Sequence, residues 1–178
     1  MKTHSDKIFN YLDLKPEIDE SVLLAPGCKI IGDVKIEKDS SIWFNTVVRG
    51  DVNYITIGKM TNVQDLSMLH VTAKIYPLTI GNYVTIGHSV TLHGCKLEDK
   101  CFIGMGATIL DGAIVETNSM VAAGALVKQG FTVPSGKLVG GVPAKIIRDL
   151  TTEEIDNIKS SAERYKEYAE LTFNSIES

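Results

Sequence analysis

Aliphatic side chains recur at every sixth position along most of this chain. The series starts at Leu24 and ends at Val139, with two insertions and one five-residue interval from Leu92 to Leu97. Its members are Leu24, Ile30, Ile36, Ile42, Val48, Ile57, Val63, Leu69, Ile80, Ile86, Leu92, Leu97, Ile103, Ile109, Val115, Val121, Val127, Val133 and Val139. A six-residue repeat does not return to one face of an α-helix, whereas it is typical of a parallel β-helix built from hexapeptides. We therefore predict an all-β solenoid over residues 24–142.

In such a fold each hexad forms one short strand and a tight turn, and three hexads close one triangular coil. The aliphatic residue fills the axis, and the residue four positions later turns the corner inward, where only small groups fit. The first of these corner residues are Cys28, Val34, Ser40, Thr46 and Val52. Because each coil covers the one before it, the sheets have exposed edges only at the two ends.

Two insertions lengthen the repeat. The interval from Val48 to Ile57 is three residues too long, and the interval from Leu69 to Ile80 is five residues too long. If each is one hexad with a bulging loop, three members of the series fall on the same face of successive coils: Val48, Leu69 and Leu92. The residues that follow these members then stack in one column: Arg49, His70 and His93.

By the same count, Asp65 and His88 occupy equivalent positions on the preceding face. An alternative count begins a hexad at Ile75, and it places His70 and His93 on different faces. The two counts therefore differ in whether these histidines lie close together.

The two ends of the chain break the pattern. Residues 1–23 are predicted to be an irregular lead-in, and Pro143 ends strand pairing after the last hexad. Thr151 and Glu154 have the spacing of a capping box, which begins a helix. Apolar residues then follow at spacings of three and four: Ile155, Ile158, Ala162, Tyr165 and Ala169. We predict an amphipathic helix over residues 151–173 that packs Tyr165 against the β-helix or a neighbouring subunit, within a single domain of residues 1–178.

Composition excludes several classes of partner. The chain has 178 residues, a net charge of −4 and a pI near 5.6, which argues against a nucleic-acid-binding surface. No apolar run approaches the roughly 20 residues of a membrane span. The first residues after Met1 are polar and are not followed by the apolar segment of a signal peptide, so we expect a cytoplasmic protein.

The cysteines fit the same compartment. There are three, Cys28, Cys95 and Cys101, which is an odd number without close pairing. Such a set is not the disulfide framework of a secreted protein and suits a reducing cytosol. Cys95 lies two residues after His93, so a ligand role has to be weighed. A small buried hydrophobic residue is the favoured interpretation, because free cysteine is among the most buried residue types.

Three of the four histidines are candidate metal ligands: His70, His88 and His93. Imidazole is the commonest metal ligand near neutral pH, and three histidines with one open position are the arrangement of catalytic zinc. His70 and His93 can reach one ion, because stacked strands lie about 4.8 Å apart. His88 points from another face, so we expect a homotrimer in which His88 of one chain meets His70 and His93 of the next. His4 is interpreted as a structural residue.

Polar residues near these histidines are placed where they can support a metal site. Metal-bound histidine usually donates its other N–H group to a carboxylate or a carbonyl. Arg49 can pair with Asp51 or Asp65, from its own chain or a neighbour, and Gln64 can hydrogen-bond a metal-bound hydroxide or a substrate oxygen. The alternative is that the charged residues only form ion pairs at an interface.

The residue blocks around these positions resemble those of the gamma-class carbonic anhydrases. The blocks are residues 41–51 (SIWFNTVVRGD), 57–65 (IGKMTNVQD), 69–70 (LH), 86–95 (IGHSVTLHGC) and 103–107 (IGMGA). The resemblance covers residues from about Tyr11 to the C-terminal helix. It implies a left-handed β-helix and a homotrimer with zinc, or iron or cobalt, at each interface. The implied activity is the reversible hydration of CO2 to bicarbonate by a zinc-bound hydroxide, which is a lyase reaction.

The resemblance also implies residue roles. The metal ligands would be His70, His88 and His93, two from one chain and one from its neighbour. Arg49 and Asp51 match the inter-subunit ion pair of the family. Gln64 matches the residue beside the metal-bound water, and Asn62 and Asp65 match the groups around it.

One departure from the family pattern concerns proton transfer. The archetypal enzyme has a glutamate directly after the position of Asp51 and acidic residues just after the first histidine, and these serve as a proton shuttle. Here those places hold Val52 and residues 71–75 (VTAKI), which contain no acid. The missing relay is expected to slow CO2 hydration unless buffer or another group replaces it.

Two other functions fit the same fold. Hexapeptide acyltransferases share the motif of residues 140–145 (GGVPAK) and use one histidine as a base with an acyl-CoA donor. A metal-binding scaffold protein with little or no activity is the third possibility. Fold alone does not separate these functions, whereas three histidines in metal-ligand spacing favour the lyase.

Overall fold

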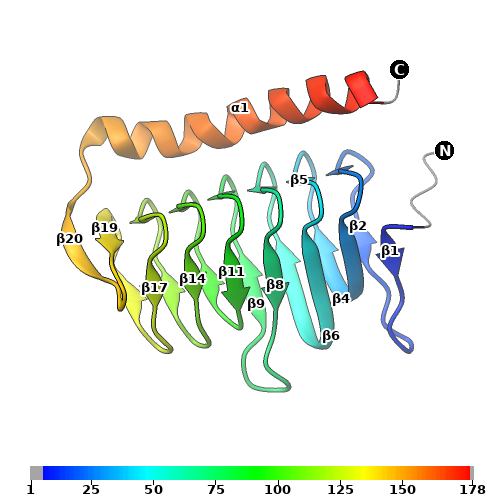
Figure 1. Ribbon diagram of the computed structural model, residues 1–178, viewed down its shortest axis with the longest axis horizontal. Helices are drawn as coiled ribbons and strands as arrows, with labels where there is room; N and C mark the ends of the chain where they lie inside the picture. The colour runs from blue at the N-terminus through cyan, green and yellow to red at the C-terminus, as the bar shows by residue number, and fades with distance from the viewer. Residues whose placement is uncertain (1–5, 177–178) are drawn as a thin grey trace.

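The computed structural model describes residues 6–176, and they form a three-sided prism of stacked coils with one long helix beside it (Figure 1). Two sheets make the prism, one of twelve strands and one of eight. The larger sheet wraps around two sides, because the long strands β4 (Lys29–Ile36) and β6 (Val47–Ile57) continue from one side to the next. The prediction of an all-β solenoid is confirmed.

The three sides are defined by their strands. The first face contains β8 (Met68–His70), β11 (Thr91–His93), β14 (Thr108–Ile109) and β17 (Leu126–Val127). The second face contains β9 (Leu78–Ile80), β12 (Lys96–Leu97), β15 (Ile114–Val115) and β18 (Thr132–Val133). The third face contains β3 (Leu23–Leu24), β5 (Ser41–Ile42), β7 (Asn62–Val63), β10 (Thr85–Ile86), β13 (Phe102–Ile103), β16 (Met120–Val121) and β19 (Lys137–Gly140). Pairing along each face is parallel, as the hexapeptide repeat predicts.

The two ends of the prism are closed by short strands. Within the lead-in, β1 (Ile8–Phe9) and β2 (Glu17–Ile18) both pair with β4. At the other end β20 (Lys145–Asp149) runs antiparallel to β19, which covers the last edge of the third face. Edge strands with unpaired backbone groups are thereby kept to the ends of the solenoid.

The axis of the prism is aliphatic throughout. Every member of the six-residue series is buried, with no more than 3% of its surface exposed. Burying a side chain of this size contributes about 1.5–3 kcal/mol relative to leaving it in water. The repeated burial, coil after coil, is what makes the hexapeptide pattern specify this fold.

Small polar residues at the inward corners satisfy the backbone of the next coil. Ser40 Oγ donates to Gly58 O at 2.7 Å, and Thr46 Oγ1 donates to Gln64 O at 2.8 Å. Such a hydroxyl fills a narrow corner and gives a buried carbonyl a donor. Val52, which we predicted to turn inward, is instead 44% exposed. It lies inside β6, where the chain continues as an extended strand and turns no tight corner.

The two insertions have different structures. The first is no loop: its extra residues extend β6, whose pairing with β4 shifts register between Gly32 and Val34. The second is a loop of residues 71–77 that projects below β8 and β9 (Figure 1). Backbone hydrogen bonds between Thr72 and Tyr76 close this loop.

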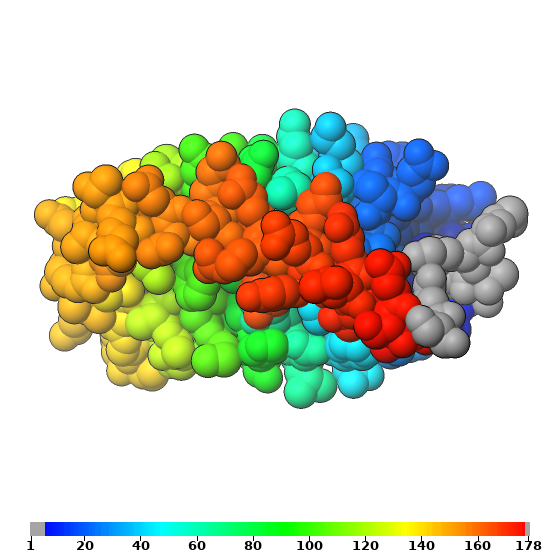
Figure 2. Space-filling model, turned by 90° about the horizontal axis from the view of Figure 1, so that it is seen from above, coloured from blue at the N-terminus to red at the C-terminus, as the bar shows by residue number. Residues whose placement is uncertain are grey.

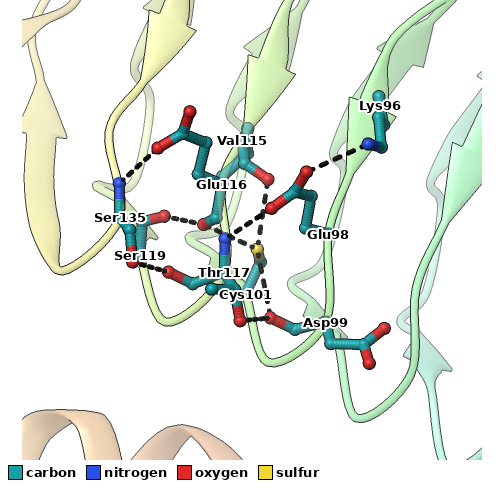
Figure 3. Close-up of polar contacts among 9 residues, drawn as sticks. All are labelled: Lys96, Glu98, Asp99, Cys101, Val115, Glu116, Thr117, Ser119 and Ser135. Carbon is teal, nitrogen blue, oxygen red and sulfur yellow. Dashed lines mark hydrogen bonds and ion pairs between the residues drawn. The ribbon is translucent and has the colours of Figure 1, made fainter.

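Polar ladders join successive turns where the second face meets the third (Figure 3). Glu98 accepts a hydrogen bond from Thr117 N at 3.2 Å, and Glu116 accepts one from Ser135 N at 2.9 Å. Glu98 also accepts from Lys96, and this hydrogen bond is the main reason why the pKa of Glu98 is lowered. The turns are thus linked by repeated side-chain to backbone hydrogen bonds.

Helix α1 (Thr152–Ile176) lies along the prism, over strands of the third face (Figures 1 and 2). Its buried residues are Ile158, Ser161, Ala162, Ala169 and Phe173. Tyr165 packs edge-on against Trp43, with ring centroids 5.7 Å apart, so the helix covers the β-helix as expected. Within residues 6–176, no helix is both long and apolar enough to span a membrane.

The predicted capping box begins this helix. Thr151 N donates to Glu154 at 2.9 Å, and Glu154 N donates to Thr151 Oγ1 at 3.2 Å. Arg148 donates to both carboxylate oxygens of Glu154 at 2.7 Å. These hydrogen bonds, that of Arg148 first, lower the pKa of Glu154 from 4.5 to about 2.

We predict that Glu154→Gln lowers the melting temperature at pH 7 and that this loss shrinks in acid. A carboxyl group whose pKa is lower in the folded state stabilises the protein above its unfolded-state pKa, and the contribution is lost as the pH falls from about 4.5 towards 2. Melting curves at pH 7 and pH 3 measure the effect. Glu153→Gln, in the same helical turn, is the control, and an equal loss for Glu154→Gln at both pH values contradicts the prediction.

Candidate metal centre

The register of the first face places His70 directly beside His93. Strand β8 pairs with β11 so that Leu69 faces Leu92 and His70 faces His93. Val48 faces Leu69 on the preceding coil, so Arg49 begins the same column. The alternative count that begins a hexad at Ile75 is therefore wrong.

A carboxylate holds each of these two rings. His70 Nε2 lies 3.0 Å from Asp51 Oδ1, and His93 Nδ1 lies 2.8 Å from Asp111 Oδ1. An ionised carboxylate only accepts hydrogen bonds, so the ring nitrogen that faces it carries the proton. The nitrogens left over, His70 Nδ1 and His93 Nε2, face each other at 3.1 Å.

This arrangement fits a metal ion. Two neutral imidazoles held in this way turn two lone pairs towards each other, and such a contact is favourable only when a metal ion or a proton is shared between them. Ligand nitrogens about 2.0–2.1 Å from a tetrahedral zinc ion lie about 3.3 Å apart, close to the spacing of these two atoms. The pair thus has the donor type and the separation of two metal ligands.

Arg49 contacts the Asp51 carboxylate that holds His70. Its guanidinium forms an ion pair with Asp51 of its own chain. Burial acts to raise the pKa of Asp51, but the hydrogen bonds from His70 and Arg49 outweigh it and leave this pKa below its ordinary value. Asp51 is therefore held as an anion between a cation and an imidazole. We call Arg49, Asp51, His70, His93 and Asp111 the first half-site.

The remaining predicted residues gather at another corner. His88 Nδ1 lies 2.7 Å from Asp65 Oδ2, and the His88 side chain is 44% exposed. Gln64 Nε2 donates to Asn62 Oδ1 at 3.1 Å, and both of these side chains are buried. Asp65 leaves His88 with a free Nε2 by the same tautomer argument. We call Asn62, Gln64, Asp65 and His88 the second half-site.

A groove of about 520 Å³ opens beside the second half-site. Gln64 and His88 line it together with residues of the third face and of helix α1. Tyr165 of the helix also lines the groove, and burial raises the pKa of this phenol. A small molecule that enters this groove from solvent can therefore reach Gln64 and His88.

The two half-sites lie at opposite ends of one strand of the first face. His88 precedes β11 (Thr91–His93), and His93 ends it. Between residues 6 and 176, no three His, Cys, Asp or Glu side chains of a single chain are arranged to hold a metal ion. One chain thus offers two facing imidazoles at one place and a single imidazole at another. His4 lies outside the described residues.

The cysteines do not take part. Cys28, Cys95 and Cys101 are free thiols and all are buried. Burial raises the pKa of Cys95 to about 12, and it has the same effect on Cys28 and Cys101. A metal binds the thiolate, which these environments disfavour. The interpretation of Cys95 as a small buried hydrophobic residue is confirmed.

Asp111 is the one member of the first half-site that was not predicted. It follows His93 by 18 residues, which is three hexads, and therefore lies one coil further along the prism. Leu92 faces Ile109 on that coil, so Leu110 comes opposite His93 and Asp111 lies one residue beyond it. A nominal coil of 18 residues leads from His93 to Asp111, but the five-residue interval from Leu92 to Leu97 makes Leu110 the residue opposite His93.

Known proteins with hexapeptide repeats are similar to this chain in sequence and in fold. Residues 94–129 match the family model described as bacterial transferase hexapeptide (six repeats). A crystal structure of a hexapeptide transferase family protein from Anaplasma phagocytophilum superimposes with a TM-score of 0.90 and 42% identity, covering 93% of this chain and 98% of that one. The left-handed parallel β-helix is thereby confirmed.

Two relatives bear on the site. "Gamma carbonic anhydrase 2, mitochondrial" of Arabidopsis thaliana is 50% identical over 169 residues, which are 92% of this chain and 61% of that protein. The chain thus spans less than two thirds of that relative. "Carbonic anhydrase" of Geobacillus kaustophilus is 41% identical over 160 residues, which are 90% of this chain and 87% of that protein.

Proposed function

The chain belongs to the gamma carbonic anhydrase family, and from this premise we propose that it catalyses the reversible hydration of CO2 to bicarbonate at a metal shared between the subunits of a homotrimer. The observation that carries this proposal is that the three candidate histidines lie at two separate places on one chain. Two imidazole nitrogens face each other in the first half-site, and one imidazole stands alone in the second. A heterologous contact that closes after three copies joins the two half-sites three times.

The metal would be held by His70 through Nδ1 and by His93 and His88 through Nε2. Zinc suits three imidazoles with one open position, and iron(II) or cobalt(II) accepts the same ligands. When bound there, zinc would act as a Lewis acid that lowers the pKa of a water molecule and so supplies a nucleophile for CO2.

The protein groups around this position would orient the reactants. Gln64 donates its amide N–H to Asn62, which leaves its carbonyl oxygen to accept a hydrogen bond from the attacking water. Asp51 and Asp65 hold the rings of His70 and His88 in one tautomer. Arg49 holds Asp51 in place.

Proton removal would depend on solvent buffer. Val52 is exposed where the archetypal enzyme has a carboxylate, and residues 71–75 of the projecting loop contain no acid. Without a fixed relay, the proton released by the attacking water has to leave with a diffusing base. We therefore expect turnover to rise with buffer concentration.

Exposed apolar side chains support the trimer. Leu66 is 63% exposed, directly beside Asp65, and Met68 and Met105 are 40% and 57% exposed. Leu66 has a left-handed backbone, with a φ of 60°, as do other turn residues such as Met60 and Ser89. Apolar surface around the lone His88 is what a neighbouring subunit would cover.

A cytoplasmic location belongs to the same proposal. The three thiols are free and buried, and thiols persist in a reducing compartment. CO2 and bicarbonate are the small-molecule substrates, and we propose neither a nucleic-acid partner nor a membrane partner.

Metal content and CO2 hydration, measured on one preparation of the protein, test the function. We expect nearly one zinc ion per chain after supplementation, CO2 hydration above that of free zinc, and a rate that rises with buffer concentration. His88→Ala is expected to lose most of its zinc and its activity, because one of three ligands is removed. His4→Ala, which changes the remaining histidine, is the control and is expected to keep both.

Two results would redirect the assignment. Tight coenzyme A binding by a protein that takes up no zinc would favour the acyltransferase, which the hexapeptide transferase relative makes the second candidate. Bound zinc with CO2 hydration no faster than that of free zinc, even at high buffer concentration, would indicate a metal-binding scaffold.

The trimer has a separate test. We predict that Leu66→Glu dissociates the trimer, because it buries an unpaired charge beside His88 in the assembled interface. Light scattering after gel filtration measures the mass. Leu12→Glu is a matched control, since Leu12 is also exposed and also has a left-handed backbone, with a φ of 53°. An unchanged trimer mass for Leu66→Glu would contradict this placement of the interface.

A further inference from the structure

Asp111 makes a contact that the proposed reaction does not yet use. Its Oδ1 atom accepts a hydrogen bond from His93 Nδ1 at 2.8 Å, and the two side chains are only 26% and 34% exposed. The residue lies on the coil next to that of His93, two positions after Ile109, which faces Leu92. The carboxylate is thus carried by the rigid part of the fold.

The projecting loop holds the same carboxylate from another side. Thr72 Oγ1 lies 3.1 Å from both carboxylate oxygens of Asp111, so its single hydroxyl hydrogen is shared between them. Thr72 is itself fixed, because Asn53 Nδ2 donates to its carbonyl oxygen at 3.0 Å. Two side chains from different segments therefore orient the plane of the carboxylate.

Gly94 provides the room for this arrangement. A Cβ atom at this position would lie 2.2 Å from Asp111 Oδ1 and 2.7 Å from Tyr76 Cβ. Its backbone is also left-handed, with a φ of 52°. A side chain next to His93 would push the carboxylate away from the ring, so the glycine and the Asp111 contact belong together.

We propose that Asp111, fixed by Thr72, is a positioning residue that keeps the proton of His93 on Nδ1 and turns its Nε2 towards the metal. This inference rests on the proposed function, because it assigns His93 as a ligand. A carboxylate that accepts from the remote nitrogen fixes the tautomer, restrains ring rotation and makes the ligating nitrogen more basic. Asp111 thereby does for His93 what Asp51 does for His70 and Asp65 does for His88.

Two measurements test this role together: the zinc affinity and the tautomer of the His93 ring. Chelator competition measures the zinc dissociation constant of the trimer, and ¹⁵N shifts of the zinc-free protein, labelled in histidine, give the tautomer. For Asp111→Ala we expect zinc binding about 10- to 100-fold weaker and a His93 ring that no longer keeps its proton on Nδ1. Asp111→Asn retains an oxygen acceptor, so we expect partial rescue, and Thr72→Val is expected to weaken binding less than Asp111→Ala.

Asp99→Ala is the matched control. Asp99 also bridges two coils, where it accepts from Asn82 N at 2.8 Å, but it touches no histidine. This variant is expected to lose thermal stability without any change in zinc affinity or in the His93 tautomer. Asp111→Asn keeps the test possible if Asp111→Ala does not fold.

The outcomes separate this inference from the proposed function. Asp111 variants that bind zinc as tightly as the wild-type trimer, with an unchanged His93 tautomer, overturn the inference and leave the function standing. A wild-type trimer that takes up no zinc contradicts the proposed function, and the nitrogen shifts alone then decide whether Asp111 fixes the tautomer.

Discussion

The parallel register between β8 and β11 is the constraint on which the candidate centre depends. It places His70 opposite His93, with two ring nitrogens 3.1 Å apart. The same solenoid geometry leaves His88 in the turn between β10 (Thr85–Ile86) and β11 (Thr91–His93), whereas His93 lies at the far end of β11. Because the coils are stacked by backbone hydrogen bonds and by a continuous aliphatic axis, neither position can adjust to the other. The fold that pairs two histidines also prevents the third from joining them within one chain.

An aspartate carboxylate orients the ring of each of these histidines. Each of the three imidazoles has one nitrogen within 3.0 Å of an aspartate oxygen, and these aspartates are Asp51, Asp65 and Asp111. An imidazole held in this way presents its other nitrogen as a lone pair. Each half-site therefore has its ligand nitrogens oriented in the separate chain, and in the proposed trimer assembly would only have to bring the two together. Such preorganisation reduces the ordering cost of binding.

Much of this could be predicted from the sequence, because a strict repeat converts position in the chain into position in space. The six-residue series gave the axis, the corners and the pairing of His70 with His93. The predictions that Val52 turns inward and that the first insertion forms a loop were wrong, since an insertion can lengthen a strand as readily as it forms a loop. Asp111 was missed because it is close to His93 in space and 18 residues away in the chain. The ion pair of Arg49 was left open between Asp51 and Asp65 of the same or a neighbouring chain, and within one chain its guanidinium pairs with Asp51.

The most direct test of a centre shared between chains is complementation in mixed trimers. His88→Ala keeps an intact first half-site, and His93→Ala keeps an intact second half-site. Trimers purified through two different tags, one on each variant, contain both chains and therefore one junction where intact half-sites meet. A centre shared between chains predicts about one zinc ion per mixed trimer and little or none in trimers of either variant alone. Mixed trimers as free of zinc as the two parents, or a His88→Ala trimer that binds zinc as fully as the wild type, would contradict it.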